Sequence, residues 1–265
     1  MRTLVTNDDG IMAPGLLALR RALMELGDVT VVAPTAPQSA VGHTITLSDP
    51  VRVHRVSLGD GGVGWAVEGS PADCVKMALY ELMPERPDLV ASGVNLGANV
   101  GINVLYSGTV AAAIEAAFIG LPAMSVSIDA TLRSSPLRST RPAETVDFDG
   151  AARITRRLID QTIARNLSQP ALLNVNVPDL SKGPPRSVKV VPQSLKGWRK
   201  SWERRNHPRG GAYYWMVGEM RTEEEGAETD IAALADRYVT VTPLQFDLTD
   251  HGRLDDVRRW DLRLE

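Results

Sequence analysis

The sequence has only one cysteine, Cys74, and four histidines among its 265 residues. A single thiol excludes an intramolecular disulfide, and no cluster of cysteine and histidine indicates a zinc site. No stretch approaches the roughly 18 uninterrupted apolar residues of a membrane-spanning helix. The formal net charge of −3 gives no overall field that would attract a nucleic-acid polymer or an anionic membrane, so any recognition of phosphate has to be local. We expect a soluble, cytoplasmic protein.

Hydrophobic residues make up 43% of the chain, enough for one large domain or one domain with an appendage. Residues 3–6 and 28–34 have the pattern of buried strands, and the leucines from Leu16 to Leu26 recur at helical spacing. Such alternation predicts an α/β fold with a mostly parallel sheet flanked by helices. It continues with helices expected at 70–83, 109–120 and 149–166 and strands at 86–93, 121–128 and 171–178, beside β-like stretches at 44–47 and 51–56.

The composition changes after residue 181. Three β-like segments follow, separated by long charged connections, at 187–193, 212–217 and 237–244. Short strands of this kind need support from the main domain or from another subunit. We therefore divide the chain into a main domain at 1–181, a β-hairpin extension for oligomerisation at 182–245, and a C-terminal segment at 246–265 that returns to the main domain.

Two adjacent carboxylates, Asp8 and Asp9, follow the first expected strand. In an open parallel sheet, ligands bind outside the carboxyl ends of the strands. The pair can converge on one ion only if the backbone is already turning, which Gly10 permits. Oxygen ligands suit magnesium, manganese or calcium better than zinc. The alternative is that an Asn-Asp-Asp-Gly run is ordinary turn chemistry.

Other polar loops are expected at the same edge of the sheet. Ser39 lies after the second strand, and Asn95, Asn99 and Asn103 lie in a glycine-rich segment after another. The glycine spacing there is not the G-x-G-x-x-G fingerprint, which disfavours a nicotinamide site. An asparagine offers a neutral carbonyl oxygen to a cation, although the segment can equally be an irregular connection.

The helix expected at 109–120 begins with two hydroxyls and free backbone N–H groups, at Ser107, Gly108 and Thr109. Such a terminus is suited to phosphate, and its alternative is routine N-capping. If the carboxylate pair, the serine loop, the asparagine loop and this helix start share one edge, then a metal ion together with a phosphate is the economical interpretation.

Seven ordered motifs resemble the SurE (survival protein E) family of 5'/3'-nucleotidases. They are TNDDGIMAPGL, VVAPTAPQSAVGH, VEGSPADCV, SGVNLGANVG, YSGTVAAAIEAAFIGLPAMSVS, LNVNVP and YVTVTPL, spread from residue 6 to residue 244. The resemblance implies a Rossmann-like domain and a metal-dependent phosphomonoesterase acting on nucleoside 5'- and 3'-monophosphates, in some members also on short polyphosphate. It further implies a C-terminal β extension used in a homodimer or homotetramer.

Carried over by motif, the family's ligands of one divalent ion per subunit (Mg, Mn or Co) fall on Asp8, Asp9, Ser39 and Asn95. The resemblance places Ser107, Gly108 and Thr109 on the phosphate side, and we add Asn7 as a substrate-binding residue. The sequence departs from the family's pattern in having Ser70 where threonine is usual and Arg237 where glycine is expected. The second departure could alter the extension or its assembly contacts.

The resemblance supports a mechanism in which the ion polarises phosphorus and activates a water while the 107–109 segment stabilises the transferring phosphoryl group. Asp8 or Asp9 is the candidate base, and His43 is a weaker one. The rival functions are a non-catalytic nucleotide- or phosphate-binding module and a haloacid-dehalogenase-type phosphatase, whose D-x-D spacing this sequence lacks. Aromatic residues of the extension, from Trp198 to Trp215, suit either stacking on a base or packing at an interface.

Overall fold

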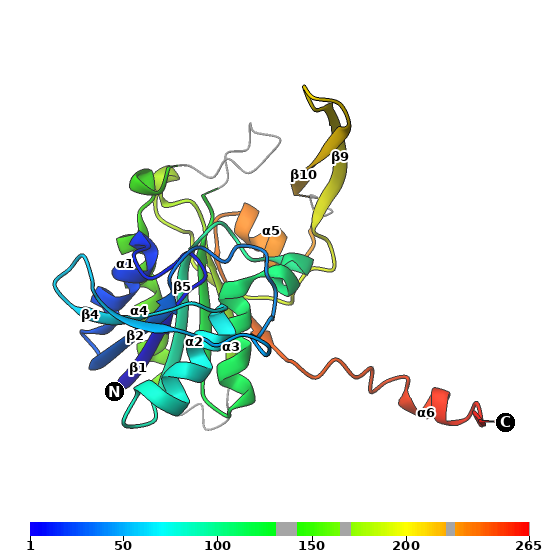
Figure 1. The fold of residues 1–265 in the computed structure, drawn as a ribbon. Helices are drawn as coiled ribbons and strands as arrows, with labels where there is room; N and C mark the ends of the chain where they lie inside the picture. The colour runs from blue at the N-terminus through cyan, green and yellow to red at the C-terminus, as the bar shows by residue number, and fades with distance from the viewer. Residues whose placement is uncertain (131–141, 165–170, 221–225, 265) are drawn as a thin grey trace.

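The computed structural model describes residues 1–130, 142–164, 171–220 and 226–264, and shows a nine-stranded sheet (Figure 1). The strand order is β3-β4-β2-β1-β5-β6-β7-β11-β8. Only two neighbouring pairs, β3 with β4 and β7 with β11, are antiparallel, which confirms the expected mostly parallel α/β sheet. The strands are β1 (Arg2–Thr6), β2 (Asp28–Pro34), β3 (Val53–Ser57), β4 (Val63–Val67), β5 (Leu89–Leu96), β6 (Ala123–Ile128), β7 (Leu172–Val177), β8 (Val188–Val190) and β11 (Val239–Leu244).

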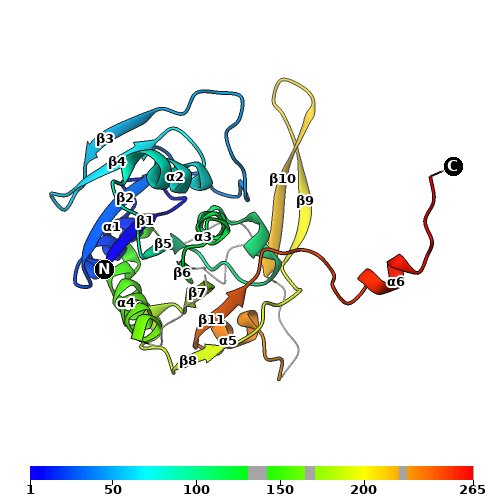
Figure 2. The ribbon, with the colours of Figure 1, turned by 90° about the horizontal axis from the view of Figure 1, so that it is seen from below.

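Helices cover both faces of this sheet (Figure 2). Helices α1 (Pro14–Leu23) and α4 (Phe148–Ala164) pack on one face, and α2 (Pro71–Met77) and α3 (Gly108–Phe118) on the other. Helix α2 continues as a single π-helical turn, Ala78–Leu82. The alanines of α3 let its backbone lie close to the strands. No helix in the described part of the chain is both long and apolar enough to cross a membrane.

The topology places a switch point between β1 and β5. From β1 the chain builds outward through β2 and β4 on one side and through β5, β6 and β7 on the other. In open parallel sheets, the crevice outside the carboxyl ends at such a switch point is the usual place for a ligand. Asp8 and Asp9 follow β1, and Asn95 lies near the end of β5.

The extension is smaller than the sequence predicts. Strand β11 pairs with β7, and β8 pairs with β11, so both complete the main sheet. Only β9 (Trp198–Asn206) and β10 (Ala212–Met220) form a separate antiparallel hairpin, which protrudes from the body (Figure 1). The short helix α5 (Asp230–Ala235) packs Ile231 and Leu234 against Val100. Strand patterns alone do not say which sheet a strand joins, so the predicted boundary of 182–245 needs this correction.

Two short segments also differ from their expected structure. Residues 44–47 form no strand, because the backbone N–H and hydroxyl of Thr46 bond to the Asp73 carboxylate (3.0 and 2.7 Å) instead of to a neighbouring strand. Residues 63–67, which the sequence did not mark as β-like, form β4 and bridge β2 to β3. The hairpin of β3 and β4 therefore extends the sheet on this side.

Arg237, where the family pattern expects glycine, occupies the left-handed region with a φ of 68°. A side chain there costs roughly 1–2 kcal/mol. Its guanidinium donates to the carbonyl oxygens of Asp179 (3.3 Å), Gly183 (2.5 Å) and Pro184 (3.0 Å), and so ties the start of β11 to the chain before β8. These bonds offset the backbone strain at the position.

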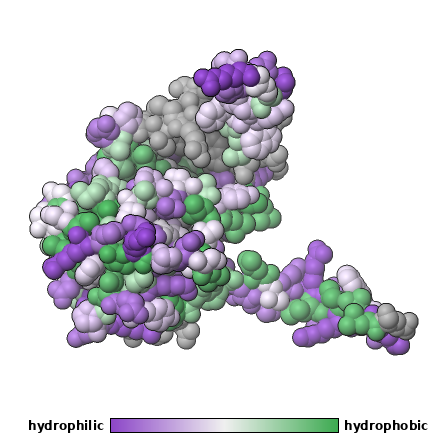
Figure 3. Space-filling model, viewed as in Figure 1, coloured by the Kyte–Doolittle hydropathy of each residue, from purple (hydrophilic) through white to green (hydrophobic). Residues whose placement is uncertain are grey.

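The C-terminal segment does not return to the main domain as predicted. Phe246 at its start packs edge-on against Phe118 of α3, with ring centroids 4.5 Å apart. Beyond it the chain extends away from the body, and helix α6 (Leu254–Arg258) has no buried residue (Figure 1). Figure 3 shows apolar side chains mixed with polar ones along this tail, whereas the far end of the hairpin is strongly hydrophilic. The apolar residues Leu248, Trp260 and Leu262 of this tail are exposed.

Candidate metal and phosphate site

A tight turn after β1 positions the two carboxylates. The side-chain amide of Asn7 accepts from the backbone N–H of Gly10 (3.2 Å) and donates to its carbonyl oxygen (3.0 Å). Gly10 has a φ of 99°, which a residue with a side chain rarely adopts. Asn7 is fully buried and shapes the turn. Its part in substrate binding stays a prediction.

Asp8 lies against the start of α3. Its carboxylate accepts a hydrogen bond from the hydroxyl of Thr109. A Cβ atom at Gly108 would lie only 2.8 Å from the Cβ of Asp8, so the glycine permits this close approach. Burial raises the pKa of Asp8, against the opposing effect of the Thr109 hydroxyl and of the N–H groups of Thr109 and Gly108. The positive end of α3 therefore faces Asp8.

Asp9 is tied to the end of β5. One of its oxygens, Oδ2, accepts from the backbone N–H of Leu96 (3.1 Å). Burial, together with the neighbouring charge of Asp8, raises the pKa of Asp9 to about 6. Asn95 donates its amide nitrogen to the carbonyl oxygen of Gly97 (2.7 Å). Its Oδ1 has no hydrogen bond with the described residues and remains available as a neutral ligand.

Two backbone hydrogen bonds anchor the loop that carries Ser39. The backbone N–H of Gln38 donates to the carbonyl oxygen of Asp8 (2.7 Å), and that of Gly42 donates to Tyr106 (3.1 Å). Ser39 lies between these anchors and is exposed. The loop thus connects the carboxylate turn to the residue that precedes Ser107.

The start of α3 confirms the N-capping alternative for one hydroxyl. Ser107 accepts from the backbone N–H of Val110 (3.1 Å) and is the N-cap. The hydroxyl of Thr109 is directed to Asp8. Both hydroxyls are thus used in holding the helix and the carboxylate, and phosphate binding at this terminus stays a prediction.

The predicted ligands form an oxygen-only set of two carboxylates, one hydroxyl and one amide. Among the described residues no group of three or more histidine, cysteine, aspartate or glutamate side chains gathers at one point. Burial and mutual repulsion oppose ionisation of Asp8 and Asp9, and a hard divalent cation would offset both effects. These residues therefore fit magnesium or manganese, which accept carboxylate and carbonyl oxygens.

The chain was compared with known proteins. The family model described as Survival protein SurE matches residues 3–200. A 5'-nucleotidase SurE from Syntrophobacter fumaroxidans is 46% identical over 262 residues, covering 99% of this chain and 100% of the relative. The chain belongs to the SurE family. A 5'-nucleotidase SurE from Heliobacterium modesticaldum is 42% identical over 261 residues, covering 98% of this chain and 92% of the relative. The solved SurE protein from Aquifex aeolicus superposes with a TM-score of 0.81 at 31% identity, covering 99% of this chain and 100% of that chain.

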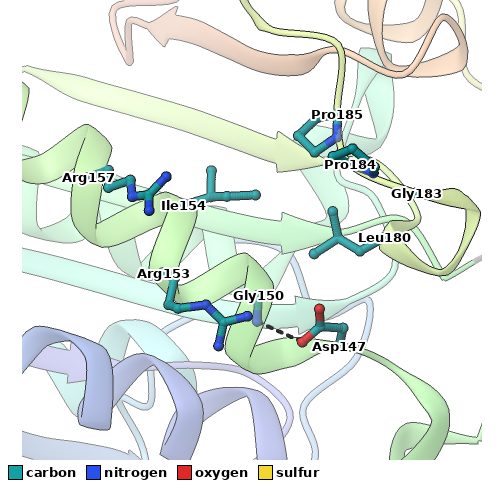
Figure 4. Close-up of a pocket in the computed structure, with 9 residues that line it drawn as sticks. All are labelled: Asp147, Gly150, Arg153, Ile154, Arg157, Leu180, Gly183, Pro184 and Pro185. Atoms are coloured by element: carbon teal, nitrogen blue, oxygen red, sulfur yellow. Dashed lines mark hydrogen bonds between the residues drawn. The ribbon is translucent and has the colours of Figure 1, made fainter.

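This SurE chain also has a hollow away from the carboxylates, between α4 and residues 180–185 (Figure 4). Its volume is about 390 Å³, and Arg153 and Arg157 line it beside Ile154 and Leu180. None of the predicted metal or phosphate residues lines it. The hollow therefore lies outside the candidate site.

A buried carboxylate behind the Ser39 loop was missed by the sequence analysis. Glu115 of α3 is 4% exposed, and its two oxygens accept from Lys76 of α2 (2.6 Å) and from His43 (2.8 Å). The His43 ring stacks on Phe118, with centroids 5.3 Å apart. Although burial acts to raise it, these hydrogen bonds hold the pKa of Glu115 below its ordinary value. The network fixes the distal end of the Ser39 loop in this SurE protein and gives His43 a structural role. A lone carboxylate within the alanine run of 111–117 was the available signal.

We expect Glu115→Gln to lower the free energy of unfolding by about 2 kcal/mol at neutral pH, because charge-assisted hydrogen bonds to a buried group are lost. A carboxyl with a lowered pKa stabilises the fold above its unfolded pKa, so the deficit should shrink on acidification. Urea unfolding at neutral and acid pH measures it. Glu81→Gln, at an exposed position, is the control. Equal stability of the two variants would contradict the assignment.

Proposed function

We propose that this chain is a nucleotidase that releases phosphate from nucleoside 5'-monophosphates and, with the same site, from 3'-monophosphates and short-chain polyphosphate. The observation that carries the proposal is the carboxylate pair at the β1/β5 switch point, with Asp8 buried, Asp9 half-buried and the start of α3 directed at Asp8. The 5'-nucleotidase SurE relatives support the activity.

The proposed site holds one divalent ion, Mg, Mn or Co, through Asp8, Asp9, Ser39 and Asn95. When bound, such an ion supplies charge stabilisation and lowers the pKa of a water. The Thr109 hydroxyl orients Asp8 and the Leu96 N–H orients Asp9, so both carboxylates are preorganised. Phosphoryl transfer needs mainly positioning and charge stabilisation, which such a site provides without a side-chain nucleophile.

Asp9 is the better placed of the two to take up a proton. Its Oδ2 is occupied by the N–H of Leu96, while its Oδ1 has no hydrogen bond with the described residues. Asp8 is more deeply buried and accepts from Thr109. Proton uptake at Oδ1 of Asp9 from an attacking water would keep the bond from Leu96 to Oδ2, whose second lone pair remains for the ion.

Phosphate release tests the function directly. The metal-stripped chain should release phosphate from nucleoside 5'- and 3'-monophosphates only after Mg, Mn or Co is restored. The same assay with tripolyphosphate as substrate tests the proposed hydrolysis of short-chain polyphosphate. Binding of nucleotide without release, with every ion, would instead indicate a non-catalytic binding module. A trapped aspartyl-phosphate would indicate haloacid-dehalogenase chemistry.

We expect manganese to raise the melting temperature more at about pH 7.5 than at about pH 5, because protons on the carboxyls compete with the cation. The raised pKa values of Asp8 and Asp9 mean that the folded chain binds more protons than the unfolded chain just above the ordinary carboxyl range. The contribution of these two carboxyls to the stability of the metal-free protein therefore falls as pH rises through about 6. Differential scanning fluorimetry at the two pH values, with and without manganese, measures both effects. Equal manganese-induced shifts in melting temperature at the two pH values would contradict the first.

We further propose that the protein is a homodimer or homotetramer assembled through its C-terminal part. The hairpin exposes Trp202, Tyr214 and Trp215, and the tail exposes Trp260 and Leu262. Aromatic residues of this kind are enriched at protein interfaces. The side chain of Trp198 lies outside the described part of the structure. Light scattering of the full chain and of a chain ending at residue 245 tests the assembly.

A further inference from the structure

A polar hollow of about 370 Å³ lies at the carboxyl ends of β2 and β4, next to the carboxylate turn. Thr35 follows the last residue of β2, and Glu68 follows the last residue of β4. The backbone N–H of Thr35 donates to the carbonyl oxygen of Val67 (2.9 Å) and joins the two strand ends. The hollow is thus built on the same edge of the sheet as the candidate metal site. It is lined by Thr35, Gln38, Thr44, Ile45, Thr46, Glu68, Gly69 and Ser70.

The hollow begins where the candidate phosphate site ends. Gln38 lines it, and the N–H of Gln38 donates to the carbonyl oxygen of Asp8 (2.7 Å). In the sheet β1 neighbours β2, and β2 neighbours β4. Since neighbouring strands are about 4.8 Å apart, the end of β4 lies about 10 Å from the end of β1. A phosphate held by a divalent ion at Asp8 and Asp9 would therefore place an attached sugar and base along the hollow.

The walls of the hollow are held in one shape by the start of α2. Ser70 is the N-cap of this helix and forms a capping box with Asp73. The hydroxyl of Ser70 also donates to the carbonyl oxygen of Thr44 (2.6 Å), and both oxygens of Asp73 accept from Thr46. These hydroxyls are used in the structure itself. The resulting rigid rim lowers the entropic cost of binding a ligand.

Two lining side chains have hydrogen-bonding capacity left. The side-chain amide of Gln38 is half-buried and makes no hydrogen bond with the described residues. Glu68 accepts from Nε2 of His54 (2.9 Å) and from Arg52 (3.2 Å), which orient its carboxylate and balance its charge. An ionised carboxylate has about four acceptor positions, so Glu68 can accept from a ligand as well. Its charge balance also limits repulsion of a nearby phosphate.

We propose that this hollow binds the ribonucleoside part of the substrate, with Glu68 accepting hydrogen bonds from the ribose hydroxyls and Gln38 bonding to the sugar between Glu68 and the phosphate. A carboxylate at the end of a parallel strand reads ribose hydroxyls in other α/β proteins, and the volume is within the range of small-ligand pockets. The inference rests on the proposed function, because it assumes a phosphate bound through the ion at Asp8 and Asp9.

Kinetics with three substrates test the inference: adenosine 5'-monophosphate, its 2'-deoxy counterpart and p-nitrophenyl phosphate, which has no sugar. The metal-loaded full chain is used throughout. We expect Glu68→Gln to lower the ratio of kcat/KM for adenosine monophosphate to that for p-nitrophenyl phosphate by about tenfold, mainly through KM, because one charge-assisted hydrogen bond is lost. The preference of the wild type for the ribonucleotide over the deoxyribonucleotide should shrink in the same variant. Gln38→Ala should lower the first ratio by about threefold to tenfold, since its bond is neutral.

Glu25→Gln is the matched control, because Glu25 is also an exposed carboxylate paired with an arginine, Arg156, and lies outside the hollow. It should keep the wild-type ratios. Thermal unfolding verifies that each variant is folded. Ratios within twofold of the wild type in both Glu68→Gln and Gln38→Ala would overturn the inference while leaving the nucleotidase proposal intact. A wild type that hydrolyses p-nitrophenyl phosphate but no nucleotide would instead overturn the proposed function, and the inference with it.

Discussion

Asp9→Asn is expected to lower the kcat/KM for nucleoside monophosphates by more than about a hundredfold. Mutating a residue that only hydrogen-bonds to a metal ligand already lowers metal affinity or activity by about 10–100-fold, and Asp9 is proposed to bind the ion itself. Asparagine retains an oxygen that can accept from the N–H of Leu96, so the geometry of the turn is kept while the charge is removed. Because burial and the charge of Asp8 raise the pKa of Asp9 to about 6, its ionised form costs stability at neutral pH. The metal-free variant should therefore be at least as stable as the wild type. Functional residues that lower the stability of the fold are a common form of the trade-off between activity and stability.

The two effects of Asp9→Asn separate a ligand from a merely structural residue. Activity assays in saturating manganese and thermal unfolding with and without the ion measure both. Asp149→Asn, which removes an exposed carboxylate paired with Arg21, is the control and should change neither quantity. Near-normal turnover of Asp9→Asn in saturating metal would be incompatible with the proposed site, and so would a metal-dependent rise in melting temperature equal to that of the wild type.

Gly108→Ala is the second change with a large expected effect. Alanine is the better helix former, so helix propensity alone would favour it. The added Cβ atom, however, would lie 2.8 Å from the Cβ of Asp8 and 3.1 Å from Pro71, and the buried Asp8 has to move. Displacing a catalytic group by about 1 Å can cost up to about a hundredfold in rate, and overpacking costs about 1–3 kcal/mol of stability. We therefore expect the kcat/KM of Gly108→Ala to be between tenfold and a hundredfold lower than that of the wild type.

A comparable glycine provides the control for this substitution. At Gly59, in the turn between β3 and β4, an added Cβ atom would meet nothing closer than Leu17 at 3.6 Å, an ordinary contact. Gly59→Ala should leave activity and melting temperature near the wild-type values. If Gly108→Ala matched it in activity, the close approach of α3 to Asp8 would not matter for catalysis. Steady-state kinetics and calorimetry of the two variants decide this.

Local patterns predicted the central strands β1, β2, β5, β6 and β7 and the helices between them, because each of these signals depends on neighbouring residues. The leucines of α1 and the N-cap at Ser107 appear as the sequence suggests. The carboxyl-end rule also predicted that the loops after β1, β2 and β5 would meet. The hydrogen bonds from Leu96 to Asp9 and from Gln38 to Asp8 show that they do.

Pairings between distant segments could not be read from local patterns. Residues 239–244 look the same in a hairpin extension as in a main sheet, and only their pairing with 172–177 decides between them. Glu115 offered one carboxylate in a run of alanines, but its partners lie on α2 and in the Ser39 loop. Thr46 belongs to a β-like stretch, yet bonding to Asp73 keeps it out of any strand.

The hairpin has a consequence for how the chain folds. Strands β9 and β10 pair in register from Asn206 with Ala212 to Trp198 with Met220, so the two ends of this excursion lie side by side. If the hairpin forms before β11 pairs with β7, the segment between β8 and β11 behaves as a much shorter loop. The entropy lost in closing a loop grows with its effective length, and folding slows as contacts become more remote in sequence. Once formed, this hairpin shortens the effective loop that must close for β11 to pair with β7.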